Sequence, residues 1–284
     1  MSSAKPAAEL AARRRLAERL RSLRVGAGLS TTQLARRLGW SQAKVSRIET
    51  ATHGVAPGDV RAWAEALDAS PEQVEQLVEQ AWTASIEVRN FRRELAAGYA
   101  SGQAAFGQLE AQAALLRSFQ HLVVPALLQL QPYALALFQR ARPVAQDAEA
   151  AADARLARQR ILDDPARRFE WVITEAALWW RPSSWMVQAE QLRAVAEAAT
   201  RPNVDLRVLP LEVQAPTFYH SFTILDEHLV VADSLGAIRL HDPDDIAWQI
   251  EVFTRMQQAA LDPVASRVVL EGLAARFAIR GREG

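Results

Sequence analysis

The chain has 284 residues, half of them apolar, and its 33 Lys and Arg balance 33 Asp and Glu, a size and composition that favour one small and one larger domain. The absence of cysteine excludes disulfides, thiolate metal sites and cysteine nucleophiles. The sequence contains neither a signal peptide nor an apolar run of membrane-spanning length, so we expect a soluble cytoplasmic protein with no membrane partner.

The first 61 residues are strongly basic. They carry 12 Lys and Arg against 4 Asp and Glu, a net charge of +8, which leaves −8 for the remaining residues. A basic segment joined to an acidic remainder favours contact with a polyanion. Within this segment, Leu16, Leu20 and Leu23 recur at helical spacing, so residues 9–25 are predicted to form an amphipathic helix.

Two short helices separated by a glycine turn are predicted next. Ser30, followed three residues later by Gln33, is typical of a capping box that opens the first helix. Gly39 ends that helix, and Ser41 caps the second one, residues 42–49. In this geometry the second helix can lie in a major groove of DNA while the first braces it.

The stretch GLSTTQLARRLGWSQAKVSRIE resembles the helix-turn-helix of the lambda-repressor-like regulators, also called the xenobiotic-response-element family. The resemblance covers about residues 9–80 and implies an all-α domain of five helices. It also implies roles for individual residues: base-edge contacts by Gln42, Ala43, Lys44 and Arg47, phosphate contacts by Thr31 and Ser41, and an orienting ion pair between Arg24 and Glu49.

The chemistry of these side chains fits base reading. Arg and Lys can donate to guanine O6 and N7, Gln can pair with adenine, and Ala can contact a thymine methyl group. A plain structural bundle is the alternative, but it has no need for Gln, Lys and Arg on the outside of the second helix. Two features depart from the family pattern: Trp40 replaces a small β-branched residue, and the loop between Glu49 and Pro57 is longer than usual.

The end of the N-terminal domain is predicted from helix-start signals at Pro57 and Pro71. Residues 72–95 have the composition of a connecting helix, and the glycine-rich stretch 98–107 is predicted to be a hinge. The predicted domains are 1–80 for DNA binding, 81–107 for the connecting helix and hinge, and 108–284 for regulation, dimerisation or partner binding.

The C-terminal domain is predicted to mix helices and strands. Helices are predicted at 108–120, 147–162 and 188–199, and strands at 169–174, 204–209, 218–225, 228–233 and 237–240, with a hairpin turn at 226–227. We therefore expect an α+β protein whose C-terminal domain has a small antiparallel sheet of about four strands partly covered by helices.

Residues 85–278 resemble a domain that follows such helix-turn-helix domains in many actinobacterial regulators. The residues that carry the resemblance are LE at 109, VPALLQ at 124, Tyr133, the pair Arg158 and Gln159, and PNVDLRVLP at 202. The use of 31 Arg against 2 Lys suits a GC-rich genome. Members of that group are described as antitoxin-like and are often encoded beside a small protein, which implies a small partner protein for this domain.

An enzymatic interpretation would use His220, His228 and the acidic run at 241–245. Their spacing matches no zinc motif, and Asp242 before Pro243 reads as a helix cap. The sequence also lacks a Gly-x-Ser-x-Gly elbow and a phosphate-binding loop. We therefore predict no enzyme activity, no catalytic residue, no metal and no cofactor.

Four tryptophans, Trp171, Trp179, Trp180 and Trp185, fall within fifteen residues. One interpretation is an aromatic pocket for a small-molecule effector; the other is hydrophobic core or a dimer interface. The sequence leaves both open.

These observations favour a sequence-specific DNA-binding transcriptional regulator, a dimeric repressor that reads a palindromic operator in double-stranded DNA with helix 42–49. The alternative is an antitoxin-like interaction protein whose C-terminal domain binds a small partner protein or effector. A metal-dependent hydrolase is the least favoured function.

Overall fold

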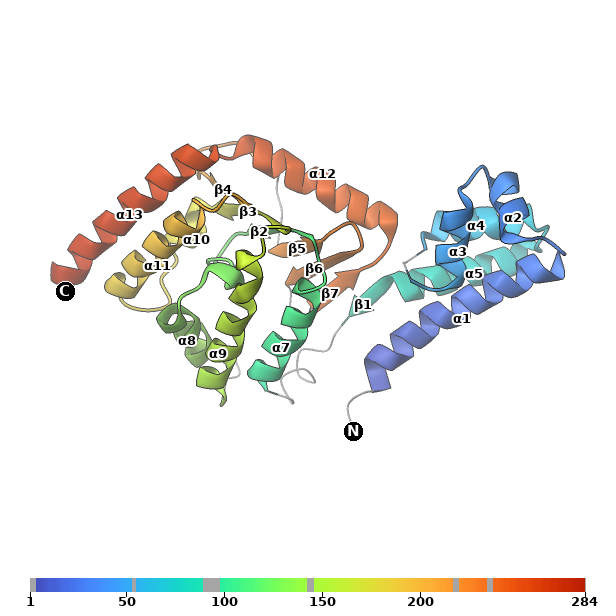
Figure 1. Cartoon of the computed structure of the whole chain (residues 1–284), viewed down its shortest axis with the longest axis horizontal. Coiled ribbons are helices and arrows are strands. Elements are labelled where there is room, and N and C mark those ends of the chain that lie inside the picture. Colours follow the sequence, from blue (N-terminus) through green and yellow to red (C-terminus); the bar gives the residue numbers. More distant parts are fainter. Residues whose placement is uncertain are drawn as a thin grey trace. The chain divides into compact units, whose positions relative to one another are not determined.

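The computed structural model of the chain describes residues 4–52, 55–88, 98–141, 146–216, 220–233 and 237–283 (Figure 1). The fold is α+β, as the sequence predicts. The chain divides into two compact units: the first contains Met1–Val88, Glu227–Val230 and Ile238–Trp248, and the second contains Arg89–Asp226, Val231–Ala237 and Gln249–Gly284.

Five helices make up the N-terminal part of the first unit, which we call the head. They are α1 (Ala4–Gly26), α2 (Thr31–Leu38), α3 (Gln42–Glu49), α4 (Pro57–Ala66) and α5 (Pro71–Ser85). This confirms the predicted all-α head of five helices. Strand β1 (Ile86–Val88) follows α5 directly, so the predicted connecting helix ends at Ser85, and its Phe91 lies outside the described residues.

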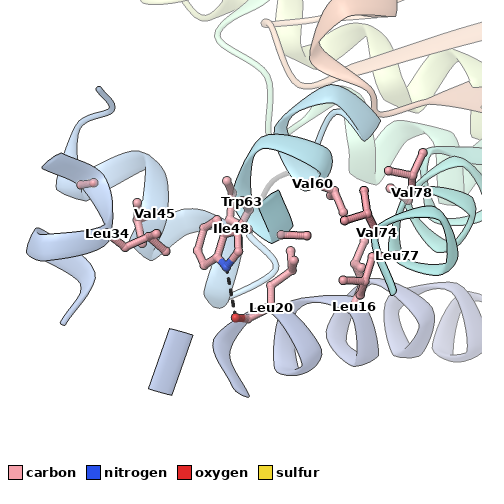
Figure 2. Packing of buried hydrophobic residues seen from close by; sticks show 13 residues of the cluster. Leu16, Leu20, Leu34, Val45, Ile48, Val60, Trp63, Val74, Leu77 and Val78 are labelled. Carbon is pink, nitrogen blue, oxygen red and sulfur yellow. Dashed lines mark hydrogen bonds between the residues drawn. The ribbon is translucent and has the colours of Figure 1, made fainter. Parts of the chain in front are cut away.

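The core of the head takes buried side chains from all five helices (Figure 2). The residues labelled in Figure 2 are Leu16, Leu20, Leu34, Val45, Ile48, Val60, Trp63, Val74, Leu77 and Val78. Trp63 is fully buried, and its indole Nε1 donates to the carbonyl of Leu20 at 3.2 Å, so α4 is tied to α1 by a polar contact as well as by packing.

We call the elements from α7 onward the body. Its helices are α7 (Tyr99–Glu110), η1 (Ala126–Leu128), α8 (Gln131–Arg140), α9 (Ala148–Arg158), η2 (Gln159–Asp163), α10 (Glu175–Trp179), α11 (Trp185–Ala198), α12 (Pro243–Ala259) and α13 (Pro263–Glu283). Its strands are β2 (Leu115–Gln120), β3 (Arg168–Thr174), β4 (Val204–Leu209), β5 (Phe222–Leu225), β6 (Leu229–Asp233) and β7 (Ala237–Leu240).

The sheet is mixed, which corrects the predicted small antiparallel sheet. The six strands of the body are neighbours in the order β7-β6-β5-β2-β3-β4, and β1 pairs antiparallel with β7. Strand β2 runs parallel to β3, and β3 runs parallel to β4, whereas β2 and β5 are antiparallel. Helices fill the connections from β2 to β3 and from β3 to β4, as parallel neighbours require. The hairpin turn at Asp226 is the one sequence feature from which the relative direction of two strands is predicted.

The stretch 98–120 also differs from its prediction. Helix α7 covers residues 99–110, of which 99–107 are predicted to be a hinge and 108–110 to begin a helix. Residues 115–120 form strand β2 where the same helix is predicted to continue. The backbone amides of Tyr99 and Ala100 donate to the carboxylate of Asp147 at 3.2 and 2.8 Å, so a residue far along the chain stabilises the start of α7. Burial on both faces of β2 removes the alternation that marks a strand in sequence.

Three of the sites that carry the resemblance of the body, VPALLQ at 124, Tyr133 and Gln159, meet in one polar network. The amide of Val124 donates to Tyr133 Oη at 3.3 Å, and Gln129 Nε2 donates to the carbonyl of Val124 at 2.6 Å. Arg155 Nη1 donates to Gln129 Oε1 at 2.7 Å, and Gln159 Nε2 donates to the Gln129 carbonyl at 2.6 Å. Burial raises the pKa of Tyr133 to about 12, so its hydroxyl stays neutral. These hydrogen bonds connect the segment 124–129 with α8, α9 and η2.

Candidate nucleic-acid interface

The turn between α2 and α3 is fixed by local hydrogen bonds. Ser30 and Gln33 form the predicted capping box, with distances of 3.2 Å from the Gln33 amide to Ser30 Oγ and 2.8 Å from the Ser30 amide to Gln33 Oε1. Gly39 ends α2 with φ 70°, a left-handed conformation that favours glycine, and the amide of Trp40 donates back to the carbonyl of Ala35 at 2.8 Å. Helix α3 therefore starts in a defined direction.

Helix α3 has an anchored face and an open face. Val45 and Ile48 are buried in the core of the head, while Gln42, Ala43 and Arg47 are exposed. Ser41 Oγ caps the helix by accepting from the amide of Lys44 at 3.1 Å. The open face is therefore presented by a helix held at its start and along its length.

The exposed side chains of Gln42 and Arg47 differ in their contacts within the protein. Gln42 Nε2 donates to Thr31 Oγ1 at 3.3 Å, which joins the first residue of α3 to the first residue of α2. The Arg47 side chain forms no ion pair with any described residue. Its carbonyl accepts from the hydroxyls of Thr50 and Thr52 at 3.2 and 3.3 Å, so the end of α3 is fixed while the guanidinium stays free to bind a ligand.

Lys44, which the resemblance places among the base-edge contacts, is engaged within the protein. Its Nζ lies 2.8 Å from Asp59 Oδ1 at the start of α4 and 4.0 Å from the ring centroid of Trp40. Trp40 departs from the family pattern in the sequence, but no prediction connects Trp40 or Asp59 with Lys44. A lysine three or four residues after an aromatic residue is the local signal that could have indicated the cation–π contact.

An almost fully buried ion pair joins Arg24 of α1 to Glu49, the last residue of α3. Arg24 Nε and Nη2 donate to the two carboxylate oxygens at 2.5 and 2.8 Å, and Nη1 donates to the carbonyl of Leu29 at 2.6 Å. The hydrogen bond to Glu49 raises the pKa of Arg24 above its ordinary value. One guanidinium therefore contacts the α1–α2 connection and the end of α3.

The loop after Glu49 is described up to Thr52 and again from Val55. Thr50 Oγ1 donates to the carbonyl of Ser46 at 3.0 Å, and Ala51 has a positive φ of 53°. Residues 53–54, in the part of the loop that is longer than the family pattern, lie outside the described residues.

The structure separates the four tryptophans of the body. Trp171 is buried in the sheet and stacks on Phe169, whereas Trp180 is 59% exposed. Trp179 and Trp185 pack on Phe277 of α13, each with ring centroids 5.1 Å apart. They therefore do not line one common surface: one belongs to the core, two to the contact between helices, and one to the exterior.

The histidines and acids considered for an enzyme site form no metal-binding cluster among the described residues. No cluster of three His, Asp or Glu side chains that could hold a metal ion occurs among the described residues. Asp242 caps α12 by accepting from the amide of Asp244 at 2.9 Å, and burial raises the pKa of Asp242. His228 is exposed. The hydrogen bond gives Asp242 a structural role, as the cap of α12.

Comparisons with known proteins agree with the division into head and body. Residues 15–77 match the family model described as a helix-turn-helix domain, which suggests DNA binding. No curated protein matches the chain. None of the helices in the described parts of the chain is long and apolar enough to cross a membrane.

Among solved structures, the chain is similar to the archaeal chromatin protein TrmBL2, whose structure "shows a novel mode of DNA binding". The identity is 15% and the TM-score is 0.34, over 70% of this chain and 64% of that one, so the chain spans less than two thirds of the length of that protein. Residues 103–272, more than half of the chain, match the model of the domain of unknown function DUF5753. The chain thus carries an N-terminal helix-turn-helix domain and belongs to the DUF5753 family.

Proposed function

We propose that the protein is a sequence-specific DNA-binding transcriptional regulator and that α3 is its reading helix. The observation that carries this proposal is the open face of α3, where Gln42, Ala43 and Arg47 are exposed while Val45 and Ile48 anchor the opposite face. Polar residues of this kind on an anchored helix after a glycine turn match the requirements for reading base edges in the major groove.

Each exposed side chain has a chemical partner in that groove. Arg47 can donate to guanine O6 and N7, and Ala43 can contact a thymine methyl group. Gln42 has its Oε1 and one amide hydrogen left for adenine after donating to Thr31. Thr31 and Ser41, at the starts of the two helices, are proposed to contact phosphates, which helix N-termini attract.

Lys44 has a smaller role in this proposal than Arg47. To reach a base, Lys44 must leave the carboxylate of Asp59 and the ring of Trp40. Because this pair is partly exposed, breaking it costs on the order of 1 kcal/mol, which offsets much of a new contact to DNA. Arg47 has no such contact to lose.

We further propose that two copies of the chain bind a palindromic operator as a repressor. One α3 reads only a few base pairs, and specific operator affinity is usually reached when two heads occupy half-sites one helical turn apart. Arg24 and Glu49 are proposed to orient α3 on each half-site, since they connect its end to α1.

The test is a selection of bound sequences from random double-stranded DNA by the full-length protein, repeated with Gln42→Ala and Arg47→Ala. We expect an enriched inverted repeat with half-site centres about 10 base pairs apart. Each variant should relax base preference at symmetric positions of the repeat. Failure to enrich any motif, or identical motifs for all three proteins, contradicts the assignment of α3 as the reading helix.

An antitoxin-like interaction protein is the second candidate. Three large apolar side chains, Leu122, Trp180 and Leu211, are at least half exposed on the body, and such groups can mark a protein-binding surface. Purification from the native host should then give a stoichiometric complex with a small protein. Loss of that complex in Leu211→Glu, with the selected DNA motif unchanged, would support this candidate.

A further inference from the structure

Helix α13 has two apolar faces, of which the body uses one. Leu270, Ala274 and Phe277 are buried, and α13 lies along α11 in the second unit (Figure 1). A Cβ built on Gly281 would lie 2.8 Å from the side chain of Met186 at the start of α11, so the two helices approach closely. The position of α13 on the body is therefore set by its inner face alone.

The outer face of α13 is an apolar stripe exposed to solvent. Val264, Val268 and Ile279 are 67%, 62% and 58% exposed. With 3.6 residues per turn, they lie opposite Leu270 together with Gly272 and Ala275, at successive spacings of four, four, three and four residues. A Cβ built on Gly272 would meet nothing within 4 Å. Single exposed apolar residues are common on protein surfaces, but a continuous stripe along one helix suits a partner helix.

We propose that this stripe pairs with the α13 stripe of a second copy of the chain in an antiparallel arrangement whose two-fold axis lies at the level of Leu270. In this register Val268 faces Gly272 of the second copy, and Val264 faces Ala275 of the second copy. Large residues thus meet small ones, as close packing of two helices requires. The two-fold axis repeats each contact.

The charges beside the stripe are self-complementary in the same register. In an antiparallel pair, each flank of one helix faces the same flank of the other. Arg267 and Glu271 lie on one flank, where they form an exposed pair 3.5 Å apart within the chain. In the proposed register, Arg267 faces Glu271 of the second copy, and Glu271 faces Arg267 of that copy, so the symmetry produces two attractive pairs.

The other flank shows the same complementarity. Asp262 caps the start of α13 by accepting from the amide of Ala265 at 2.9 Å. Arg280 lies over the ring of Trp185, 5.1 Å from its centroid, near the end of the helix. The register places Asp262 against Arg280 of the second copy. Charge complementarity on both flanks favours a second copy of this chain over an unrelated apolar partner.

This inference deepens the proposed function, because it gives the dimer a surface on the body and leaves α3 free for DNA. The inference rests on the proposed function only in assigning the dimer a role in DNA binding. The mass of the protein without DNA tests the surface, and selection of bound DNA tests the function. A dimer without a DNA motif and a motif without this dimer are therefore distinguishable results.

The first experiment is sedimentation equilibrium of the full chain and of Val268→Glu. The wild-type protein should have twice the chain mass of 31.4 kDa, and the variant should dissociate with a dimer Kd raised roughly 100-fold. The matched control is Leu211→Glu, since Leu211 is also exposed on the body but lies outside the stripe. A monomeric wild-type protein, or a V268E dimer as tight as the control, overturns the proposal.

The second experiment uses charge reversal, which also tests the antiparallel register. Arg267→Glu alone places the introduced carboxylate of one copy against Glu271 of the other, and Glu271→Arg alone places two arginines together, so each variant should be mainly monomeric. An equimolar mixture of the two variants should restore a dimer. In the heterodimer the carboxylate introduced at position 267 of one copy faces the guanidinium introduced at position 271 of the other, and Glu271 of the first copy faces Arg267 of the second, so both cross-pairs are attractive. Circular dichroism establishes that each variant is folded. Folded variants that dimerise alone as tightly as the wild-type protein, or a mixture that stays monomeric, contradict the register.

Discussion

Among the described residues, the head and the body each contain one nearly fully buried ion pair, and the two pairs have different roles. In the head, Arg24 and Glu49 connect α1 to the end of α3, directly behind the surface proposed to meet DNA. In the body, Glu110 and Arg158 join α7 to α9 inside a network that also includes Gln103. The first pair fixes the direction of a surface helix, whereas the second replaces part of a hydrophobic core. Both pairs are expected to stabilise the part of the chain that contains them, but only the pair in the head also fixes a helix that is proposed to meet DNA.

The largest expected effect is on the pair in the body. Glu110→Ala should lower the free energy of unfolding by about 3 to 5 kcal/mol, because Arg158 is left buried without a carboxylate. Urea denaturation followed by tryptophan fluorescence measures this change. The control is Glu190→Ala, an exposed carboxylate on α11, which should change the free energy by less than about 0.5 kcal/mol. A loss below about 1 kcal/mol for Glu110→Ala would show that the network tolerates an unpaired Arg158.

The corresponding change in the head should be somewhat smaller. Arg24→Ala should destabilise the head by about 2 to 4 kcal/mol, because Glu49 loses its partner and the Leu29 carbonyl loses a donor. Arg37→Ala is the matched control, since the contact of Arg37 with Asp68 is exposed and contributes little. Thermal unfolding of both variants provides the measurement. Equal stability of the two variants would mean that the buried pair does not hold α3 in place.

The fold of the head could be predicted almost completely because its signals are local. Ser30, Gln33 and Gly39 act within one turn of the chain, and their predicted roles are confirmed. The partners of Lys44 could not be predicted in the same way, because Asp59 lies fifteen residues away and approaches only after α4 has packed. The contacts proposed for Gln42 and Arg47 with DNA remain predictions.

The body was predicted less well because distant residues decide its structure. Strands β3 to β7 are predicted from their composition and confirmed, but strand direction depends on helical crossovers that no short motif encodes. Strand β2 was missed because both of its faces are buried. Asp226 has a local role in the hairpin and also accepts from the amides of Ala114 and Leu115, a contact across more than a hundred residues.

At the surface of α3, Arg47 and Lys44 are expected to differ in how much they contribute to DNA binding. Arg47→Ala should cost about 1 to 3 kcal/mol of binding free energy on the selected operator, with little change on random DNA. Lys44→Ala should cost less than about 1 kcal/mol, because Lys44 already has partners in the free protein. Titration of labelled operator at fixed salt measures both, with Arg193→Ala on α11 as the exposed control. Equal losses on operator and random DNA would assign Arg47 to phosphate contact.

The smallest expected effect concerns Asp147, which holds the start of α7. Hydrogen bonds from the amides of Ala100 and Tyr99 lower the pKa of Asp147, so its ionised form stabilises the fold above the usual carboxyl range. This stability is lost as pH falls through the lowered pKa of the folded state. Asp147→Asn should therefore reduce stability at neutral pH by less than about 1 kcal/mol, since the carboxylate is largely solvated, and the reduction should shrink as pH falls through the lowered pKa. Hydrogen exchange of the α7 amides, followed from neutral pH downward, measures the difference, and Asp153→Asn on α9 is the exposed control. A difference that does not shrink as pH falls, or an equal one in the control, would mean that the charge of Asp147 does not hold α7.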